Sequence, residues 1–187
     1  MATMLTKKRF TADEYHHMAQ VGILAPRDRV ELIDGEIVVM SPIGSRHSAC
    51  VACANRALIN AVGEQAIVQP QGSVRLDLFY EPEPDLVLLR PQADFYATRH
   101  RTPGDVLLVI EIADSSLAYD RDMKAPIYAM AGIGEYWLAD LIANWVWRYS
   151  NPERGAYKRV EQYHRGESIA PLELPNCVVP VDVFLIE

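Results

Sequence analysis

The fold is decided by LLVIEIADSSLAYDRDMKAPIYAMAGIGEYWLAD, residues 107–140. Its apolar beginning belongs to the longer run Asp105 to Ala113, which predicts a strand buried on both faces of a sheet. Asp120 to Ala131 has the spacing of a helix that stops at Gly132, and Glu135 to Leu141 returns to the pattern of a strand. Strand, helix and strand in this order predict a parallel pair joined by a right-handed crossover.

The residues before this unit predict a short helix and a hairpin. Thr11-Ala12-Asp13-Glu14 has the form of a capping box, so a helix is expected from about Ala12 to Ala19. Asp34-Gly35 separates two β-type runs, Arg29 to Ile33 and Glu36 to Met40, and this arrangement is a strong hairpin signal. An N-terminal helix and a β-hairpin should therefore precede the core.

A longer helix and further strands complete the expected domain. Ser45 to about Val62 has apolar residues at helical spacing. The other expected strands are Ala66 to Gln69, Ser73 to Leu78, Asp85 to Leu89, Trp145 to Tyr149 and Tyr157 to Gln162, with a turn at Asn151-Pro152 between the last two. Together these elements predict one α/β domain over residues 1–187, in which helices flank a mixed central sheet.

Composition points to an ordinary globular protein inside the cell. Half of the 187 residues are hydrophobic, and no apolar run approaches the roughly 18 residues that a membrane span needs. Met1 to Phe10 has no apolar core of a secretory signal, so none is expected. The three cysteines, Cys50, Cys53 and Cys177, are odd in number, which favours small buried residues in a reducing compartment. We expect a cytoplasmic protein without a membrane partner.

The net charge of −7 argues against a protein that coats nucleic acid. Such proteins need a basic surface that displaces counterions from phosphates. Two basic clusters remain, Arg99-His100-Arg101 and a later group; the later group comprises Arg154, Lys158, Arg159 and Arg165. Taken alone, each cluster is best interpreted as solvated loop charge.

Two carboxylates interrupt strands that are otherwise apolar. Asp85 opens DLVLL, and Glu111 lies inside LLVIEIA. A buried carboxylate needs a cation, a donor or a proton, because leaving it unpaired is very costly. Adjacent strands can bring the two acids together, and paired carboxylate oxygens suit Mg²⁺ or Mn²⁺. The sequence therefore predicts a divalent-metal site at these two residues.

The helix after Glu111 can bring a cation to the same place. Asp120, Lys124 and Tyr128 follow one another at intervals of four residues, so they share one helical face. If this face turns back over the strand, Lys124 can orient an attacking water and stabilise charge on a phosphorus transition state. A metal would polarise the phosphate and lower the pKa of its bound water.

These segments resemble a known family. ELIDGEIVVMSP (31–42), EPDLVLL (83–89), the segment 107–140 and the LPN…VDVF ending are similar, in order, to the Uma-type putative restriction endonuclease family of the PD-(D/E)XK superfamily. The resemblance runs from about Thr11 to the C-terminus. It implies a restriction-endonuclease-like core and a metal-dependent nuclease.

The resemblance also implies roles for single residues. Pro84-Asp85 matches the PD of the motif, which makes Asp85 and Glu111 the metal ligands. The superfamily lysine usually stands two residues after the second acid, where this chain has Ala113, and Lys124 matches a lysine displaced onto the following helix. Two supporting positions follow as well: Glu31 matches an acid that approaches the metal, and His47 stands where many members carry a histidine.

Each of these residues also has a simpler interpretation. Asp85 can be a strand-start acid that binds backbone N–H groups, and Lys124 a solvated partner of Asp120. Glu31 can be a surface acid beside the hairpin, and His47 can cap or pack the helix at Ser45. Four other acids are interpreted as plain surface charges, namely Glu64, Glu81, Glu83 and Asp94.

The leading functional prediction is a Mg²⁺- or Mn²⁺-dependent endodeoxyribonuclease that acts on DNA as a homodimer, so that each protomer cuts one strand. Trp137, Trp145 and Trp147 are expected in the core or at the dimer interface. A second hypothesis is a catalytically inactive module that keeps the fold and binds DNA or a protein, which Ala113 and the acidity favour. A third is a phosphodiesterase that acts on a small nucleotide.

Overall fold

The computed structural model describes residues 6–25 and 27–186. Residues 1–5, half of the segment Met1 to Phe10 in which no secretory signal is expected, lie outside the described residues. The helices are α1 (Ala12–Gln20), α2 (Ser45–Val62), α3 (Leu117–Tyr119) and α4 (Ala125–Met130), with a π-helical turn at Asp120–Lys124 and 3-10 turns at Gly63–Gln65, Pro103–Asp105 and Val181–Phe184. The strands are β1 (Val30–Ile33), β2 (Glu36–Val39), β3 (Ile67–Pro70), β4 (Leu86–Leu89), β5 (Val106–Ala113), β6 (Glu135–Asp140), β7 (Trp145–Glu153), β8 (Ala156–His164), β9 (Ser168–Ile169) and β10 (Val179–Pro180).

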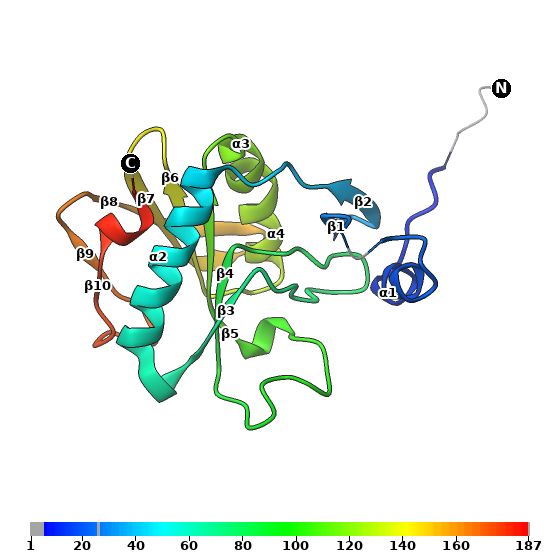
Figure 1. Cartoon of the computed structure of the whole chain (residues 1–187), viewed down its shortest axis with the longest axis horizontal. Helices are drawn as coiled ribbons and strands as arrows, with labels where there is room; N and C mark the ends of the chain where they lie inside the picture. Colours follow the sequence, from blue (N-terminus) through cyan, green and yellow to red (C-terminus); the bar gives the residue numbers. More distant parts are fainter. Residues whose placement is uncertain (1–5, 26, 187) are drawn as a thin grey trace.

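The core is a six-stranded mixed sheet in the order β3-β4-β5-β6-β7-β8 (Figure 1). β5 and β6 pair in parallel, and the other neighbouring strands pair antiparallel. All eight residues of β5 are buried, because the strand has a neighbour on each edge and a helix layer on each face. The expected α/β fold with a mixed central sheet is confirmed, as is the strand–helix–strand unit of residues 107–140.

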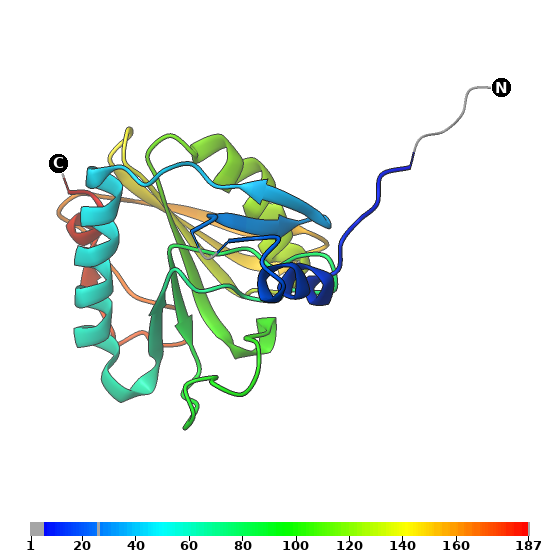
Figure 2. The same cartoon turned by 45° about the vertical axis from the view of Figure 1, so that its right-hand side comes forward.

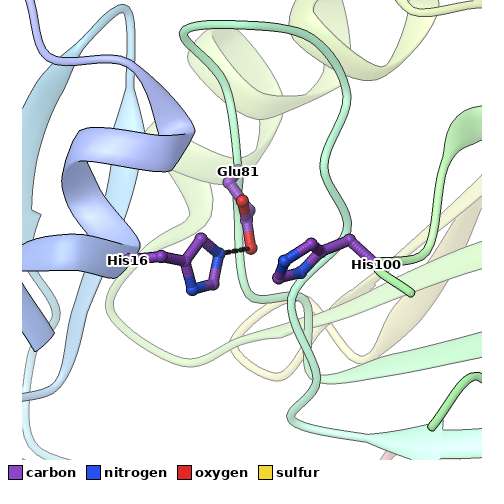
Figure 3. A group of neighbouring side chains, drawn as sticks. All are labelled: His16, Glu81 and His100. Carbon is purple, nitrogen blue, oxygen red and sulfur yellow. Dashed lines mark hydrogen bonds and ion pairs between the residues drawn. The ribbon is translucent and has the colours of Figure 1, made fainter. Parts of the chain in front are cut away.

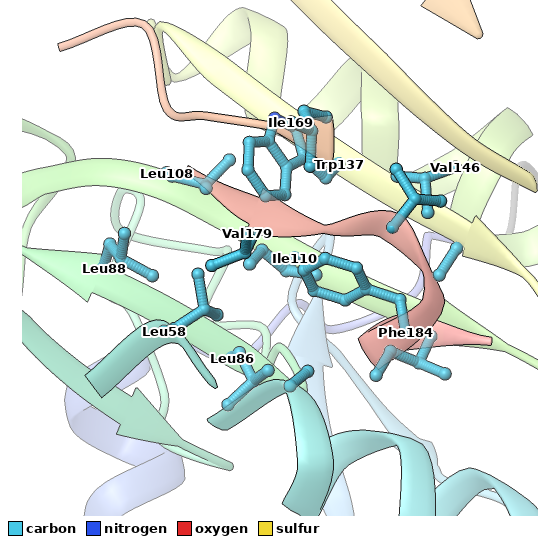
Figure 4. Close-up of a cluster of buried hydrophobic side chains, with 14 of the residues drawn as sticks. Leu58, Leu86, Leu88, Leu108, Ile110, Trp137, Val146, Ile169, Val179 and Phe184 are labelled. Carbon is cyan, nitrogen blue, oxygen red and sulfur yellow. The ribbon is translucent and has the colours of Figure 1, made fainter. Parts of the chain in front are cut away.

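One face of the sheet packs against α2 and the C-terminal segment. Leu86 and Leu88 of β4 and Ile110 of β5 contact Leu58 of α2 and Phe184 within a single buried cluster (Figure 4). Trp137 of β6 is fully buried in the same cluster, as the core interpretation of this tryptophan expected. The even-numbered residues of β4, and those of β5 from Leu108 onward, therefore belong to the α2 side of the sheet.

The opposite face packs against α4. Val87 of β4 and Val109 of β5 belong to a second buried cluster with Ala125 and Tyr128 of α4. Side chains alternate between the two faces of a strand. Odd-numbered residues of β4, and those of β5 from Val109 onward, therefore face α4, and this parity includes Glu111.

The N-terminal helix and hairpin form a separate layer at one end of the molecule. Figures 1 and 2 both place α1 beside β1 and far from α2. The expected capping box is present, since Thr11 and Glu14 exchange side chain-to-backbone hydrogen bonds at the start of α1. The hairpin joins the core through backbone hydrogen bonds between Leu32 and Glu81.

Two local predictions are wrong. Ser73 to Leu78 is irregular rather than a strand, because Asp77 accepts hydrogen bonds from two following backbone N–H groups and closes a tight turn. The turn expected at Asn151-Pro152 lies instead at Arg154-Gly155, where both residues have positive φ, as a tight hairpin turn requires. Pro152 is tolerated within β7 because β6 pairs with β7 only as far as Ser150.

The structure also shows where the cysteines lie and whether any helix could cross a membrane. Cys50 and Cys177 are buried and Cys53 is partly buried, in agreement with their expected role as small packing residues. Within residues 6–25 and 27–186, no helix has both the length and the apolar character that a membrane crossing requires.

Candidate active site

The pairing of β4 with β5 brings Asp85 and Glu111 together. Leu86 pairs with Ile110, so the next position places Asp85 directly opposite Glu111. The backbone N–H of Asp85 donates to Oε2 of Glu111 at 3.2 Å, and the N–H of Ile112 donates to Oδ2 of Asp85 at 2.9 Å. Two acids that are 26 positions apart in the chain thus share one end of the sheet.

A π-helical turn delivers Asp120 and Lys124 to the same end. The chain runs from α3 through this turn into α4, and the N–H of Ala125 bonds to the carbonyl of Asp120. Pro126 follows immediately, and a proline has no N–H and crowds the carbonyl four residues earlier. A wider turn relieves this crowding. Asp120 and Lys124 are both buried within the turn.

Lys124 lies among three carboxylates. Its Nζ is 3.0 Å from Oε1 of Glu111, 3.2 Å from Oε2 of Glu31 and 4.0 Å from Oδ1 of Asp120. The side chain is 4% exposed, so the interpretation of Lys124 as a solvated partner of Asp120 is wrong. Burial alone would lower the pKa of Lys124, but Glu111, Glu31 and Asp120 outweigh it and raise the pKa. The surrounding carboxylates therefore favour the charged form of the lysine.

Glu111 is held by three donors. Lys124 and the hydroxyl of Tyr128, at 2.9 Å, reach Oε1, and the backbone of Asp85 reaches Oε2. Burial raises the pKa of Glu111, while the charge of Lys124 opposes this rise. Tyr128 thus supports the site by orienting this carboxylate.

Glu31 and Asp120 complete the acidic group. Oε1 of Glu31 accepts from the hydroxyl of Tyr119 at 2.9 Å, and the residue is buried, so its interpretation as a surface acid is wrong. Burial raises the pKa of Asp120 to about 6, against the opposing effects of Lys124 and of a hydrogen bond from Ser116. Asp120 therefore titrates near neutral pH.

His47 enters the site from the first turn of α2. Its Nε2 is 2.9 Å from Oδ2 of Asp85, whereas Nδ1 is buried with no hydrogen-bond partner among the described residues. The hydrogen bond to Asp85 raises the pKa of His47, and burial opposes it. The N-cap of α2 is Gly44 and no side chain caps this helix, so His47 does not serve as a cap.

Apart from Tyr128, which lies behind Glu111, the side chains of this site line a cavity of about 500 Å³. The acidic side chains that line it are Glu31, Asp85, Glu111, Asp114 and Asp120, and the permanent cations are Arg29 and Lys124. If all ionise, three negative charges remain uncompensated. Oδ1 of Asp85 accepts no hydrogen bond from the residues that the structure describes, since both of its donors reach Oδ2. An all-oxygen donor set with excess negative charge fits a hard divalent cation.

Sequence reasoning missed several residues of this cavity. Arg29, Asp114, Ser116 and Tyr119 all line it, and only Tyr119 carried a usable signal, since it lies beside Asp120 at the start of the helix. The interpretation of Glu81 as a surface acid is also wrong: it is 1% exposed and lies outside this cavity. Glu83 is half-buried near Glu31, and burial raises its pKa.

Comparisons with known proteins identify a family for the chain and a solved structure with a similar fold. The family model Uma2, described as a putative restriction endonuclease, matches residues 12–182. The fold is similar to the crystal structure of a putative nuclease belonging to DUF820 from Anabaena variabilis, with a TM-score of 0.71 and 15% sequence identity, over 94% of this chain and 97% of that one. No curated protein matches the chain.

Proposed function

The chain belongs to the Uma2 putative restriction endonuclease family, and we propose that it is a divalent-metal-dependent nuclease that hydrolyses phosphodiester bonds in DNA. One observation carries this proposal. Asp85 directly before β4, Glu111 in β5 and Lys124 in the π-helical turn line one acidic cavity at the end of the sheet.

Asp85 and Glu111 would hold Mg²⁺ or Mn²⁺ through their carboxylates. Bound there, the metal would polarise the phosphate and lower the pKa of a coordinated water. Glu31 lies close enough to Lys124 to approach the same region, directly or through water. His47 would keep the Asp85 carboxylate in place by its hydrogen bond to Oδ2.

Lys124 would act as a fixed positive charge. Because its pKa is raised, it stays protonated and can orient the water and stabilise negative charge on the phosphorus transition state. Because Lys124 is already protonated, the proton that the attacking water loses needs another acceptor. Asp120, with a pKa of about 6 and an oxygen 4.0 Å from the Lys124 ammonium, is our candidate for that role.

Two features suit the cavity to a phosphate diester. Arg29 brings a guanidinium to its lining, and α2 begins there without a side-chain cap, so backbone N–H groups of its first turn remain for an anion. DNA as the substrate and a homodimer that cuts both strands are parts of the proposal. A small nucleotide diester would meet the same groups.

This chain has Ala113 where the motif usually has a lysine, two residues after Glu111. Ala113 is fully buried on the α4 side of the sheet, and the amine of Lys124 reaches Glu111 from the helix. A lysine displaced onto the following helix would supply the cation that catalysis needs, and its contact with Glu111 supports this. This arrangement favours the enzyme over the inactive binding module.

Nicking of supercoiled plasmid tests the proposal. Wild-type protein should nick DNA in the presence of Mg²⁺ or Mn²⁺, and nicking should stop when the metal is chelated. Asp85→Asn and Glu111→Gln should each reduce the rate by at least about 100-fold, because each removes a metal-ligand charge with little change of shape. Glu64→Gln, which changes an exposed acid outside the cavity, is the matched control and should keep the wild-type rate.

The same assay separates the alternatives. Nicking that survives Asp85→Asn would contradict the proposed site. Retained DNA binding without cleavage under either metal would favour the inactive module. Hydrolysis of bis(p-nitrophenyl) phosphate without any nicking of DNA or RNA would favour the small-nucleotide enzyme.

A further inference from the structure

A second cluster lies outside the cavity, at the junction of α1 with two loops. His16 comes from α1, Glu81 from the segment before β4, and His100 from the segment before β5. Their ligating atoms all lie within 4.8 Å of one another, and Figure 3 shows the two imidazoles on either side of the Glu81 carboxylate. We call these three residues the histidine cluster.

We propose that the histidine cluster binds a transition-metal ion of the zinc class, which fastens α1 to the core. The three residues supply two imidazole nitrogens and one carboxylate oxygen, the donor set of a tetrahedral zinc site that keeps water as its fourth ligand. This site is independent of the proposed nuclease activity.

The geometry needs only small adjustments. Ligand atoms of a tetrahedral zinc site are roughly 3.4 Å apart, given metal–ligand distances of about 2.0–2.1 Å. His16 Nε2 and Glu81 Oε1 are 2.8 Å apart, and the rings of His16 and His100 lie 4.4 Å apart between centroids. His16 and His100 are side chains at the surface or half-buried, so both can turn to admit an ion.

Glu81 is prepared for this role. Its side chain is fully buried and fixed on one side by Arg75, whose Nε is 3.2 Å from Oε2. The same guanidinium also binds Asp13 at 2.7 Å, so two carboxylates share one positive charge. With both imidazoles neutral, the group carries one net negative charge. Oε1 is the oxygen that faces His16.

Hydrogen bonding alone leaves His100 unexplained. Glu81 is satisfied by Arg75, His16 and the hydroxyl of Ser73. The His100 imidazole lies against His16 and makes no hydrogen bond with any group in residues 6–25 and 27–186. The ring nitrogens of His100 are therefore open to a ligand, and they lie within 4.8 Å of the ligating atoms of His16 and Glu81. Such an imidazole is suited to a metal.

Calorimetric titration of the full chain with Zn²⁺ in excess Mg²⁺ tests the site, because Mg²⁺ fills the oxygen-lined cavity but competes poorly for imidazole. Wild type should bind one Zn²⁺. His16→Ala and His100→Ala should each weaken this binding by about 100-fold or more, since even the loss of an outer partner of a metal ligand costs 10–100-fold. His17→Ala, which removes the exposed neighbouring histidine of α1, should leave it unchanged.

Two further measurements distinguish the loss of a metal ligand from misfolding of a variant. Zn²⁺ at about 100 times its Kd should raise the Tm of wild type by about 5–10 °C and leave the Tm of His100→Ala unchanged. Co²⁺ in place of Zn²⁺ should give the intense visible bands of a tetrahedral site in wild type only. The proposal is overturned if no Zn²⁺ binds in excess Mg²⁺, or if His16→Ala and His100→Ala bind it as tightly as wild type.

Discussion

The active-site cavity and the histidine cluster are two polar groups built on one short stretch of chain. Glu81 belongs to the cluster and Asp85 to the cavity, only four residues later. The cavity brings carboxylate oxygens together and adds the amine of Lys124. The cluster brings two imidazoles to a single carboxylate that Arg75 already holds.

This difference shows that buried carboxylates alone do not determine which metal ion a site prefers. In the cavity, hard oxygen donors in excess of positive charge favour Mg²⁺ or Mn²⁺. In the cluster, nitrogen donors favour an ion of the zinc class. The cavity also carries its own cation, which is consistent with a site that must tolerate both an ion and a negatively charged substrate.

The largest expected effect comes from removing that cation. Lys124→Met leaves Glu111, Glu31 and Asp120 buried without a positive partner. We expect the free energy of unfolding in urea to fall by about 3–5 kcal/mol in metal-free buffer, and to recover in part with Mn²⁺.

Lys158→Met is its control, because Lys158 forms an exposed pair with Glu153 and should contribute little to stability. Zn²⁺ binding at the histidine cluster should be unaffected by either substitution. A Lys124→Met variant as stable as wild type would show that the carboxylates of the cavity need no fixed cation.

The next effect is a dependence on pH. The pKa of Asp120 is about 6 in the folded protein, above its ordinary value of 3.8, so this group favours folding fully below pH 3.8 and loses that contribution as the pH rises through 6. Asp120→Asn has no charge to bury. Its unfolding free energy relative to wild type should therefore rise by about 2–3 kcal/mol between pH 4 and pH 7, measured without metal.

A difference that stays constant over this pH range would contradict the elevated pKa of Asp120. The nicking rate gives a second readout. If Asp120 accepts the proton, the wild-type rate should increase with pH as Asp120 ionises, and Asp120→Asn should remove that dependence.

A smaller effect concerns the orientation of Glu111. Tyr128→Phe removes one of its three donors and should lower the unfolding free energy by about 1 kcal/mol, with a modest loss of nicking. Tyr163→Phe on β8 is the matched control. Equal losses in the two variants would mean that the hydroxyl of Tyr128 has no special role.

The smallest expected effect comes from loosening α1, and of the two sites only the histidine cluster should be affected. Thr11→Ala removes the cap of α1 and should cost about 1 kcal/mol of stability, because the backbone N–H of Glu14 loses its acceptor. Because α1 then packs less firmly, Thr11→Ala should weaken Zn²⁺ binding and leave the nicking rate unchanged. Thr11→Ser keeps a hydroxyl at the cap and should restore Zn²⁺ binding. Weaker nicking in Thr11→Ala would contradict the independence of the two sites.

Much of the fold and of the cavity was predictable from the sequence. The helix at Ser45–Val62 was located to the residue, and so was the end of the central strand at Ala113, because long periodic or apolar runs leave little choice of structure. Asp85 and Glu111 were found because a charged residue inside an apolar strand needs a partner.

Other features depend on contacts that no local pattern reveals. Ser73 to Leu78 alternates like a strand, but its end is turned by the side chain of Asp77. The sequence predicts Glu81 to be a surface acid because no local pattern reveals its partners. His16 comes from α1, and Arg75 lies on the other side of the turn at Asp77. Arg29 reaches the cavity only because the hairpin folds over the end of the sheet.

The most direct test of the account is the position of Mn²⁺ in crystals of the wild-type protein, found from its anomalous scattering. The account predicts a peak within coordination distance, about 2.0–2.3 Å, of oxygens from both Asp85 and Glu111, and no such peak in Asp85→Asn. A cavity without a peak, or Mn²⁺ bound only elsewhere on the molecule, would contradict the proposed nuclease site.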